Sequence, residues 1–96
     1  MPQISKKSIA RFEYLILNIF IEKEISSFNL EFLLSLASRC KLYDKWEQKR
    51  AIEVMQQLGV LKFDGSYKIN LPLVKAIKRS EELETEIGID AKEKQA

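Results

Sequence analysis

Apolar side chains recur every three or four positions between residues 8 and 22, which is the spacing of one face of an α-helix. The positions on this face are Ile9, Phe12, Leu15, Ile16, Ile19 and Phe20. Ser8 is the predicted N-cap of the helix. A second apolar stripe consists of Tyr14, Leu17 and Ile21. A helix that is apolar on two sides is usually sandwiched, here between its own domain and either a C-terminal helix or a partner chain.

The same spacing predicts two further helices, over residues 29–40 and 45–58. Asn29 is the expected N-cap of the first, and Ile25 before it is expected to form a one-residue β-bridge. Asp44 and Glu47 have the spacing of a capping box, which marks the start of the second.

The predicted helix over residues 45–58 has one apolar and one polar side. Its inward positions are Ala51, Ile52, Met55 and Leu58. Its outward positions are Lys45, Gln48, Lys49, Glu53 and Gln56. Gly59 follows at a point where a left-handed residue commonly ends a helix.

A β-hairpin is predicted next, from "VLKF", "DG" and "SYKI", with Asp64-Gly65 as a two-residue loop. Its inner face is expected to carry Leu61, Phe63, Tyr67 and Ile69, and the opposite face Lys62 and Lys68. Pro72 suits the first turn of a fourth helix, which Gly88 is expected to end. This helix has a heptad-like seam of Leu73, Ala76, Leu83 and Ile87. The expected organisation is a domain over residues 1–71, the helix over 72–88 and a disordered tail over 89–96.

The length of 96 residues fits one compact domain, with 46% hydrophobic and 31% charged residues. Because so short a chain buries a small fraction of its surface, a homodimer is a plausible source of further stability. The expected dimer interface is the second stripe of the first helix together with the seam of the fourth, namely Tyr14, Leu17, Ile21, Leu73, Ala76, Leu83 and Ile87. If these two faces instead pack together within one chain, the protein is monomeric.

The net charge of +2 is divided unevenly along the chain. Residues 1–79 contain fourteen Lys and Arg against eight Asp and Glu, whereas residues 80–96 contain two against six. A basic body suggests an anionic partner, and the acidic tail is either solvated or a competitor for the same surface.

Residues for catalysis and metal binding are scarce. The chain has no histidine and a single cysteine, Cys40, so neither a disulfide within the chain nor a zinc site is expected. Cys40 is expected to be a small buried residue in an intracellular, cytoplasmic protein, and an intersubunit disulfide is the alternative. No nucleotide-binding glycine motif is present, and the carboxylates of "SEELETE" are expected to form a solvated helix face. We therefore expect no enzyme activity and no cofactor.

The first apolar run is interrupted by Glu13 and Asn18, which argues against a signal peptide or a membrane span.

The segment "LEFLLSLASRCKLYDKWEQKRAIEVMQQLGVLKFDGSYKIN" resembles the winged helix-turn-helix family of DNA-binding domains, in particular through Leu58, Gly59, Val60 and Leu61. The resemblance covers residues 8–70 and implies a mainly α fold with a small β-hairpin as the wing and an additional C-terminal helix. Small archaeal and archaeal-virus transcriptional regulators of this family, often homodimers, are similar in size and composition.

The resemblance makes residues 45–58 the recognition helix, which enters the major groove of double-stranded DNA. The DNA-contacting residues that it implies are Lys45, Gln48, Lys49, Arg50 and Gln56 on this helix, Lys62 and Lys68 on the wing, and Arg39 and Lys41 before the helix. Trp46 either packs inside or is exposed for stacking or partner contact. The alternative function is a protein-interaction module or accessory subunit of a replication or transcription assembly, because winged helices also serve in such roles without reading DNA.

Overall fold

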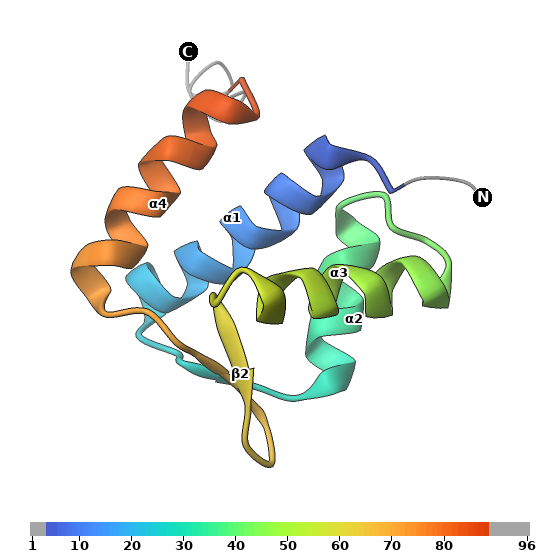
Figure 1. Cartoon of the computed structure of the whole chain (residues 1–96), viewed down its shortest axis with the longest axis horizontal. Coiled ribbons are helices and arrows are strands. Elements are labelled where there is room, and N and C mark those ends of the chain that lie inside the picture. The colour runs from blue at the N-terminus through green and yellow to red at the C-terminus, as the bar shows by residue number, and fades with distance from the viewer. Residues whose placement is uncertain (1–3, 89–96) are drawn as a thin grey trace.

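The computed structural model describes residues 4–88 and is mainly α-helical, with a small antiparallel β-hairpin after the third helix and a C-terminal helix after the hairpin (Figure 1). The elements are α1 (Lys6–Lys23), β1 (Ser27–Phe28), α2 (Leu30–Arg39), α3 (Lys45–Gln57), β2 (Leu61–Phe63), β3 (Tyr67–Ile69) and α4 (Leu73–Glu86). This confirms the predicted fold class, and the order of elements is compatible with a winged-helix-like fold. The tail prediction for residues 89–96 lies outside the described residues.

Side-chain caps define where the first three helices begin. The N-cap of α1 is Ser5, and the predicted cap Ser8 is wrong. The Ser5 hydroxyl oxygen accepts from the backbone N–H of Ser8 at 3.3 Å. At α2 the Asn29 side-chain oxygen accepts from the Phe32 N–H at 2.8 Å, as predicted. At α3 the Glu47 carboxylate accepts from the Asp44 backbone N–H at 3.2 Å, as the capping-box pattern predicts.

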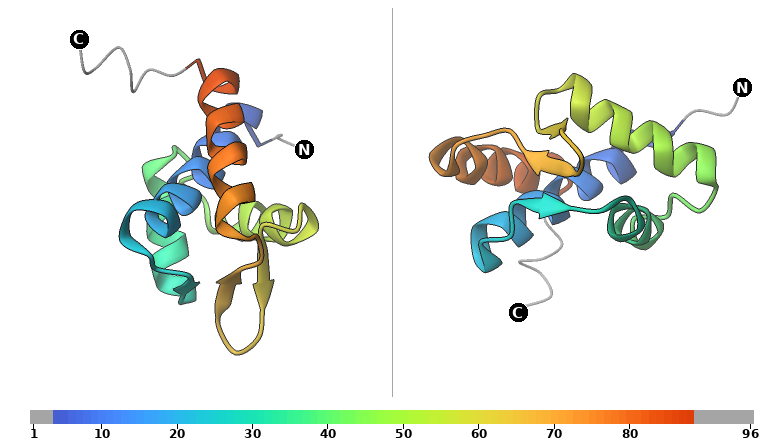
Figure 2. Two further views of the ribbon diagram at one scale, coloured as in Figure 1. Left: turned by 90° about the vertical axis from the view of Figure 1, so that its left-hand side faces the viewer. Right: turned by 90° about the horizontal axis from the view of Figure 1, so that it is seen from below.

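The sheet has the strand order β1-β3-β2, with both pairs antiparallel. The first strand is Ser27–Phe28 and not the predicted bridge at Ile25, whose side chain is exposed. Phe63 pairs with Tyr67, so the hairpin loop has three residues and the predicted two-residue loop is wrong. The Asp64 N–H donates to the Ser66 carbonyl oxygen at 2.9 Å across this loop. Gly65 between them has φ +78°, which glycine adopts without strain. The loop projects from the helical body in Figure 1 and in the left-hand view of Figure 2.

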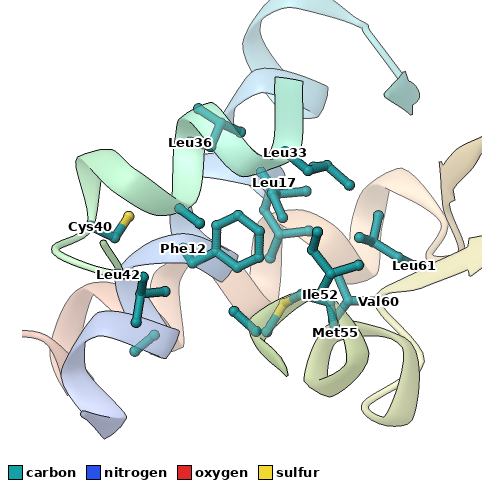
Figure 3. Close-up of a cluster of buried hydrophobic side chains, with 14 of the residues drawn as sticks. Phe12, Leu17, Leu33, Leu36, Cys40, Leu42, Ile52, Met55, Val60 and Leu61 are labelled. Atoms are coloured by element: carbon teal, nitrogen blue, oxygen red, sulfur yellow. The ribbon is translucent and has the colours of Figure 1, made fainter. Parts of the chain in front are cut away.

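A single hydrophobic core lies between the helices and the base of the hairpin (Figure 3). Phe12 of α1 is fully buried, with Leu33 of α2 and Met55 of α3 packed in the same cluster. Leu61 of β2, the first strand of the hairpin, is also buried in this core. Leu58 was predicted to face this core, but its side chain is 55% exposed, because the chain leaves the helical path there and turns at Gly59.

The second stripe of α1 and the seam of α4 pack together within the chain. Leu17, Ala76, Leu83 and Ile87 all belong to the core. Tyr14 and Ile21 of α1 are half-buried, whereas Leu73 of α4 is exposed. The assignment of the four buried residues to a dimer interface is therefore corrected, since their own chain covers them. The intramolecular alternative accounts for both apolar faces.

Polar bonds also join α1 to α4. Arg79 donates from Nε to Glu13 Oε2 at 2.8 Å and from Nη2 to Glu13 Oε1 at 3.0 Å, although Glu13 is only 1% exposed. The Ser80 hydroxyl donates to the Asn18 side-chain oxygen at 2.9 Å. The Tyr14 hydroxyl donates to Glu84 at 3.0 Å. Burial and the neighbouring Glu84 raise the pKa of Tyr14, so the hydroxyl stays a donor at neutral pH.

Candidate nucleic-acid interface

Three of the predicted DNA-contacting residues lie exposed along one side of α3. They are Lys45, Lys49 and Gln56, at separations of four and seven positions, or about one and two helical turns, which places them on the same side of the helix. Neither lysine forms an ion pair within residues 4–88. Two ammonium groups are thus available to an external anion on the exposed side of the third helix.

Gln48 does not belong to this surface, and its predicted outward position is wrong. Its side chain is 8% exposed, and its Nε2 donates to the Leu42 carbonyl oxygen at 2.8 Å and to the Tyr43 carbonyl oxygen at 3.4 Å. The side chain thereby fixes the connection between α2 and α3. The helical period placed Gln48 outward, but the preceding connection folds back over that side of the helix.

A groove of about 360 Å³ runs between α3, the start of α2 and the wing. Its α3 side is formed by Lys49, Ile52, Glu53 and Gln56, and its other side by Leu30 and Tyr67. The groove is therefore lined by one ammonium group, one carboxylate, one amide, one phenol and the two apolar side chains of Leu30 and Ile52. Arg50, which neighbours the groove-lining Lys49, is exposed and forms an ion pair with Glu53 at 3.1 Å.

The wing lysines lie on the other face of the sheet. Lys62 pairs directly with Lys68 across the two strands, while Tyr67 alternates to the side that lines the α3 groove. Lys68 Nζ lies 3.7 Å from Asp64 Oδ2, whereas Lys62 forms no ion pair among the described residues. The wing is thus cationic on one face and apolar on the other.

Arg39 and Lys41 are not brought together with the α3 groove. Arg39 lines a separate groove of about 560 Å³ between α1 and α2, with Leu15, Ile19 and Phe32 among the other lining residues. Lys41 lies in the turn after α2, at the end of that helix remote from the wing (Figure 1). Its backbone is left-handed, with φ +67°.

Large apolar side chains are exposed beside the polar groups. Trp46 is 41% exposed, so the structure favours the second of its two alternatives, exposure, over packing inside. Phe63 is 58% exposed and contacts the Tyr67 ring at a centroid distance of 4.9 Å. Leu30 and Phe32 are each 40% exposed. Leu30 and Phe32 were not predicted to be exposed, because the apolar period of α2 alone does not show that its first turn stands clear of the core.

Cys40 is buried in the core at 3% exposure, which agrees with its prediction as a small buried residue. Burial raises the pKa of its thiol to about 11, so it is neutral and unreactive at physiological pH. This burial argues against the intersubunit disulfide.

No protein-family model, no curated protein and no solved structure matches the chain. Among residues 4–88, no helix is both long enough and apolar enough to cross a membrane. The same residues contain no cluster of three histidine, cysteine or acidic side chains that could hold a metal ion.

Proposed function

We propose that this protein binds double-stranded DNA through α3 and the wing, as a small transcriptional regulator or related accessory factor of the winged-helix class. The observation that carries the proposal is the pair of unpaired ammonium groups of Lys45 and Lys49 on the exposed side of α3, next to a projecting hairpin. Lysine donates to phosphates and to guanine in the major groove, so the chemistry fits that place.

The charge balance around α3 supports the same proposal. Between residues 39 and 68 the carboxylates are occupied within the chain, two of them in the capping box of α3 and two in ion pairs. The cations of this segment without an ion pair to a described residue are Arg39, Lys41, Lys45, Lys49 and Lys62. A surplus of cations is what counterion release from DNA requires.

Gln56 and the wing have secondary parts in this proposal. Gln56 is exposed on the last turn of α3, and its amide can pair with adenine if that turn reaches the base edges. Lys62 and Lys68 face away from the α3 groove, so they are not assigned to base recognition. Their part in the proposal is to contact phosphates and so hold α3 in position on the DNA.

The experiment that tests DNA binding is selection of bound sequences from random duplex DNA, followed by titration of the selected and the random duplex at low salt. We expect retention of duplex, with affinity falling steeply as salt rises. Failure to retain any duplex at low salt would overturn the proposal.

A protein partner is the second candidate function, favoured by the mixed character of the α3 groove. Leu30, Ile52 and Tyr67 supply apolar contact area there. A partner would then be anchored by these groups and by exposed Trp46 and Phe63. Substitution of Phe63 by Ser separates the two functions, since it removes an anchor for a protein partner without changing any charge that DNA would contact.

The protein is further proposed to form a homodimer, through a surface that keeps only Leu73 of the predicted interface. The outer side of the first turns of α4 exposes Leu73, Val74 and Ile77 at 51%, 76% and 38%. A second copy would cover this stripe, which lies on another side of α4 from the buried residues Ala76, Ser80 and Leu83. Sedimentation equilibrium of the wild type and of Val74→Glu tests this point: we expect a dimer that the substitution dissociates, and a wild-type protein of monomer mass would contradict it.

A further inference from the structure

We propose that a groove between α4 and the base of the wing binds a small organic anion with an apolar body, of the class of medium-chain carboxylates. The groove has a volume of about 470 Å³ and lies apart from the α3 surface assigned to DNA. That volume is within the range of small-molecule sites, about 300–1,000 Å³. The ligand proposal does not depend on DNA binding.

One side of the groove is apolar. It is formed by Leu58 at the end of α3, Val60 at the start of the wing and Leu71 after it. Val60 is buried, Leu71 is half-buried and Leu58 is 55% exposed, so the apolar area leads from the surface toward the core. Covering Leu58 would remove an unusually exposed leucine from water.

The other side is cationic, because Lys75 and Lys78 of α4 line it. Their separation of three residues puts the two ammonium groups on neighbouring turns of one helix face. Within residues 4–88 neither lysine forms an ion pair. Both charges are therefore available to an anion placed at the rim.

The remaining charged groups of the groove are Glu13, Arg79 and Glu82, and they are bonded to one another. Arg79 makes its two bonds to Glu13 and a third, from Nη1 to Glu82 Oε1, at 3.3 Å. These bonds raise the pKa of the Arg79 guanidinium, which stays charged and held by its carboxylates. Because the two carboxylates are engaged in this way, they do not neutralise Lys75 and Lys78.

The two sides together select the ligand class. An inorganic anion would leave the apolar side of the groove exposed to water. A neutral apolar molecule would leave the ammonium groups without a partner. A carboxylate with a short hydrocarbon chain satisfies both, with its head between the lysines and its chain against Leu58 and Leu71.

The test is a titration of the isotope-labelled wild-type protein with octanoate, followed by backbone amide chemical shifts, with octanamide as the neutral probe of equal length. We expect saturable shifts that centre on residues 58–60 and 71–79. Octanoate should bind at least about tenfold more tightly than octanamide, since only octanoate pairs with the two lysines.

Two double variants give the matched comparison, because each reverses two exposed lysines. Lys75→Glu with Lys78→Glu should weaken octanoate binding by about tenfold or more and leave octanamide binding nearly unchanged. Lys45→Glu with Lys49→Glu, on the far surface of α3, should leave both unchanged. The proposal is overturned by an absence of saturable shifts at these residues, by equal affinity for the two probes, or by an equal loss in both variants.

Discussion

A single glutamine side chain determines how α3 follows α2. Gln48 bonds the carbonyl oxygen atoms of Leu42 and Tyr43 from a buried position, whereas Gln56 lies exposed two turns further along the same helix. The two glutamines therefore have different roles, although both look outward from the sequence period alone.

This contrast gives a pair of matched substitutions. Gln48→Ala should lower the free energy of unfolding by about 1–3 kcal/mol, because it leaves buried backbone carbonyls without their donor. Gln56→Ala should change it by less than about 0.5 kcal/mol, as is usual for an exposed position. Urea unfolding measures both, and equal effects of the two substitutions would contradict the assigned roles.

The buried Cys40 thiol makes stability depend on pH in the alkaline range. Its pKa is raised by burial from 9.0 to about 11, so the unfolded chain loses this proton at lower pH than the folded chain does. The contribution of the neutral thiol to the free energy of unfolding is fully present below about pH 9. It is lost as pH rises toward 11, at up to about 1.4 kcal/mol per pH unit. Tyr14, whose pKa is also raised, adds a slope of the same sign.

The measurement for Cys40 is the free energy of unfolding of the wild type and of Cys40→Ala between pH 7 and pH 11. The substitution should make the alkaline decline shallower, while the part due to Tyr14 persists. Identical slopes in the two proteins would show that the thiol does not titrate as its burial implies.

At the scale of elements, the contact between α1 and α4 combines an apolar seam with a buried ion pair. Glu13 is almost completely buried, and both of its carboxylate oxygens accept from Arg79. Such a pair contributes little net stability by itself, but removal of one partner leaves a buried charge without compensation.

Arg79→Met should therefore destabilise the protein by about 3 kcal/mol, and the double substitution Glu13→Met with Arg79→Met should recover most of that loss. Chemical unfolding of the wild type and the two variants gives the comparison. If Arg79→Met alone unfolds at the same denaturant concentration as the wild type, the pair does not hold α4 in place.

The elements themselves were largely predictable, because each has a strong local signal. Asn29 and the pair Asp44 and Glu47 mark helix starts by side-chain chemistry that acts within one turn. The three-residue hairpin loop was missed, since Asp-Gly suits a two-residue turn as well as the observed register. The packing of α4 on α1 was left open between one chain and two, because apolar spacing shows that a face is covered and not what covers it.

At the scale of the whole molecule, the predicted site residues lie on different faces. Lys45, Lys49 and Gln56 share the exposed side of α3, whereas Lys62 and Lys68 occupy the opposite face of the wing from Tyr67. Arg39 belongs to the groove between α1 and α2. Sequence spacing predicts which residues share one helix face, but the relative placement of faces depends on long-range packing that no single segment encodes.

The most direct measurement of the proposed DNA binding is the salt dependence of affinity for duplex DNA in two matched variants. Lys45→Ala with Lys49→Ala should weaken binding and reduce the slope of log affinity against log salt by about one for each lysine that contacts phosphate. Lys75→Ala with Lys78→Ala removes the same charge from α4 and should leave the slope nearly unchanged. The assignment of DNA binding to α3 would be contradicted if the variant without Lys45 and Lys49 kept the wild-type slope. It would also be contradicted if the two variants lost DNA affinity equally.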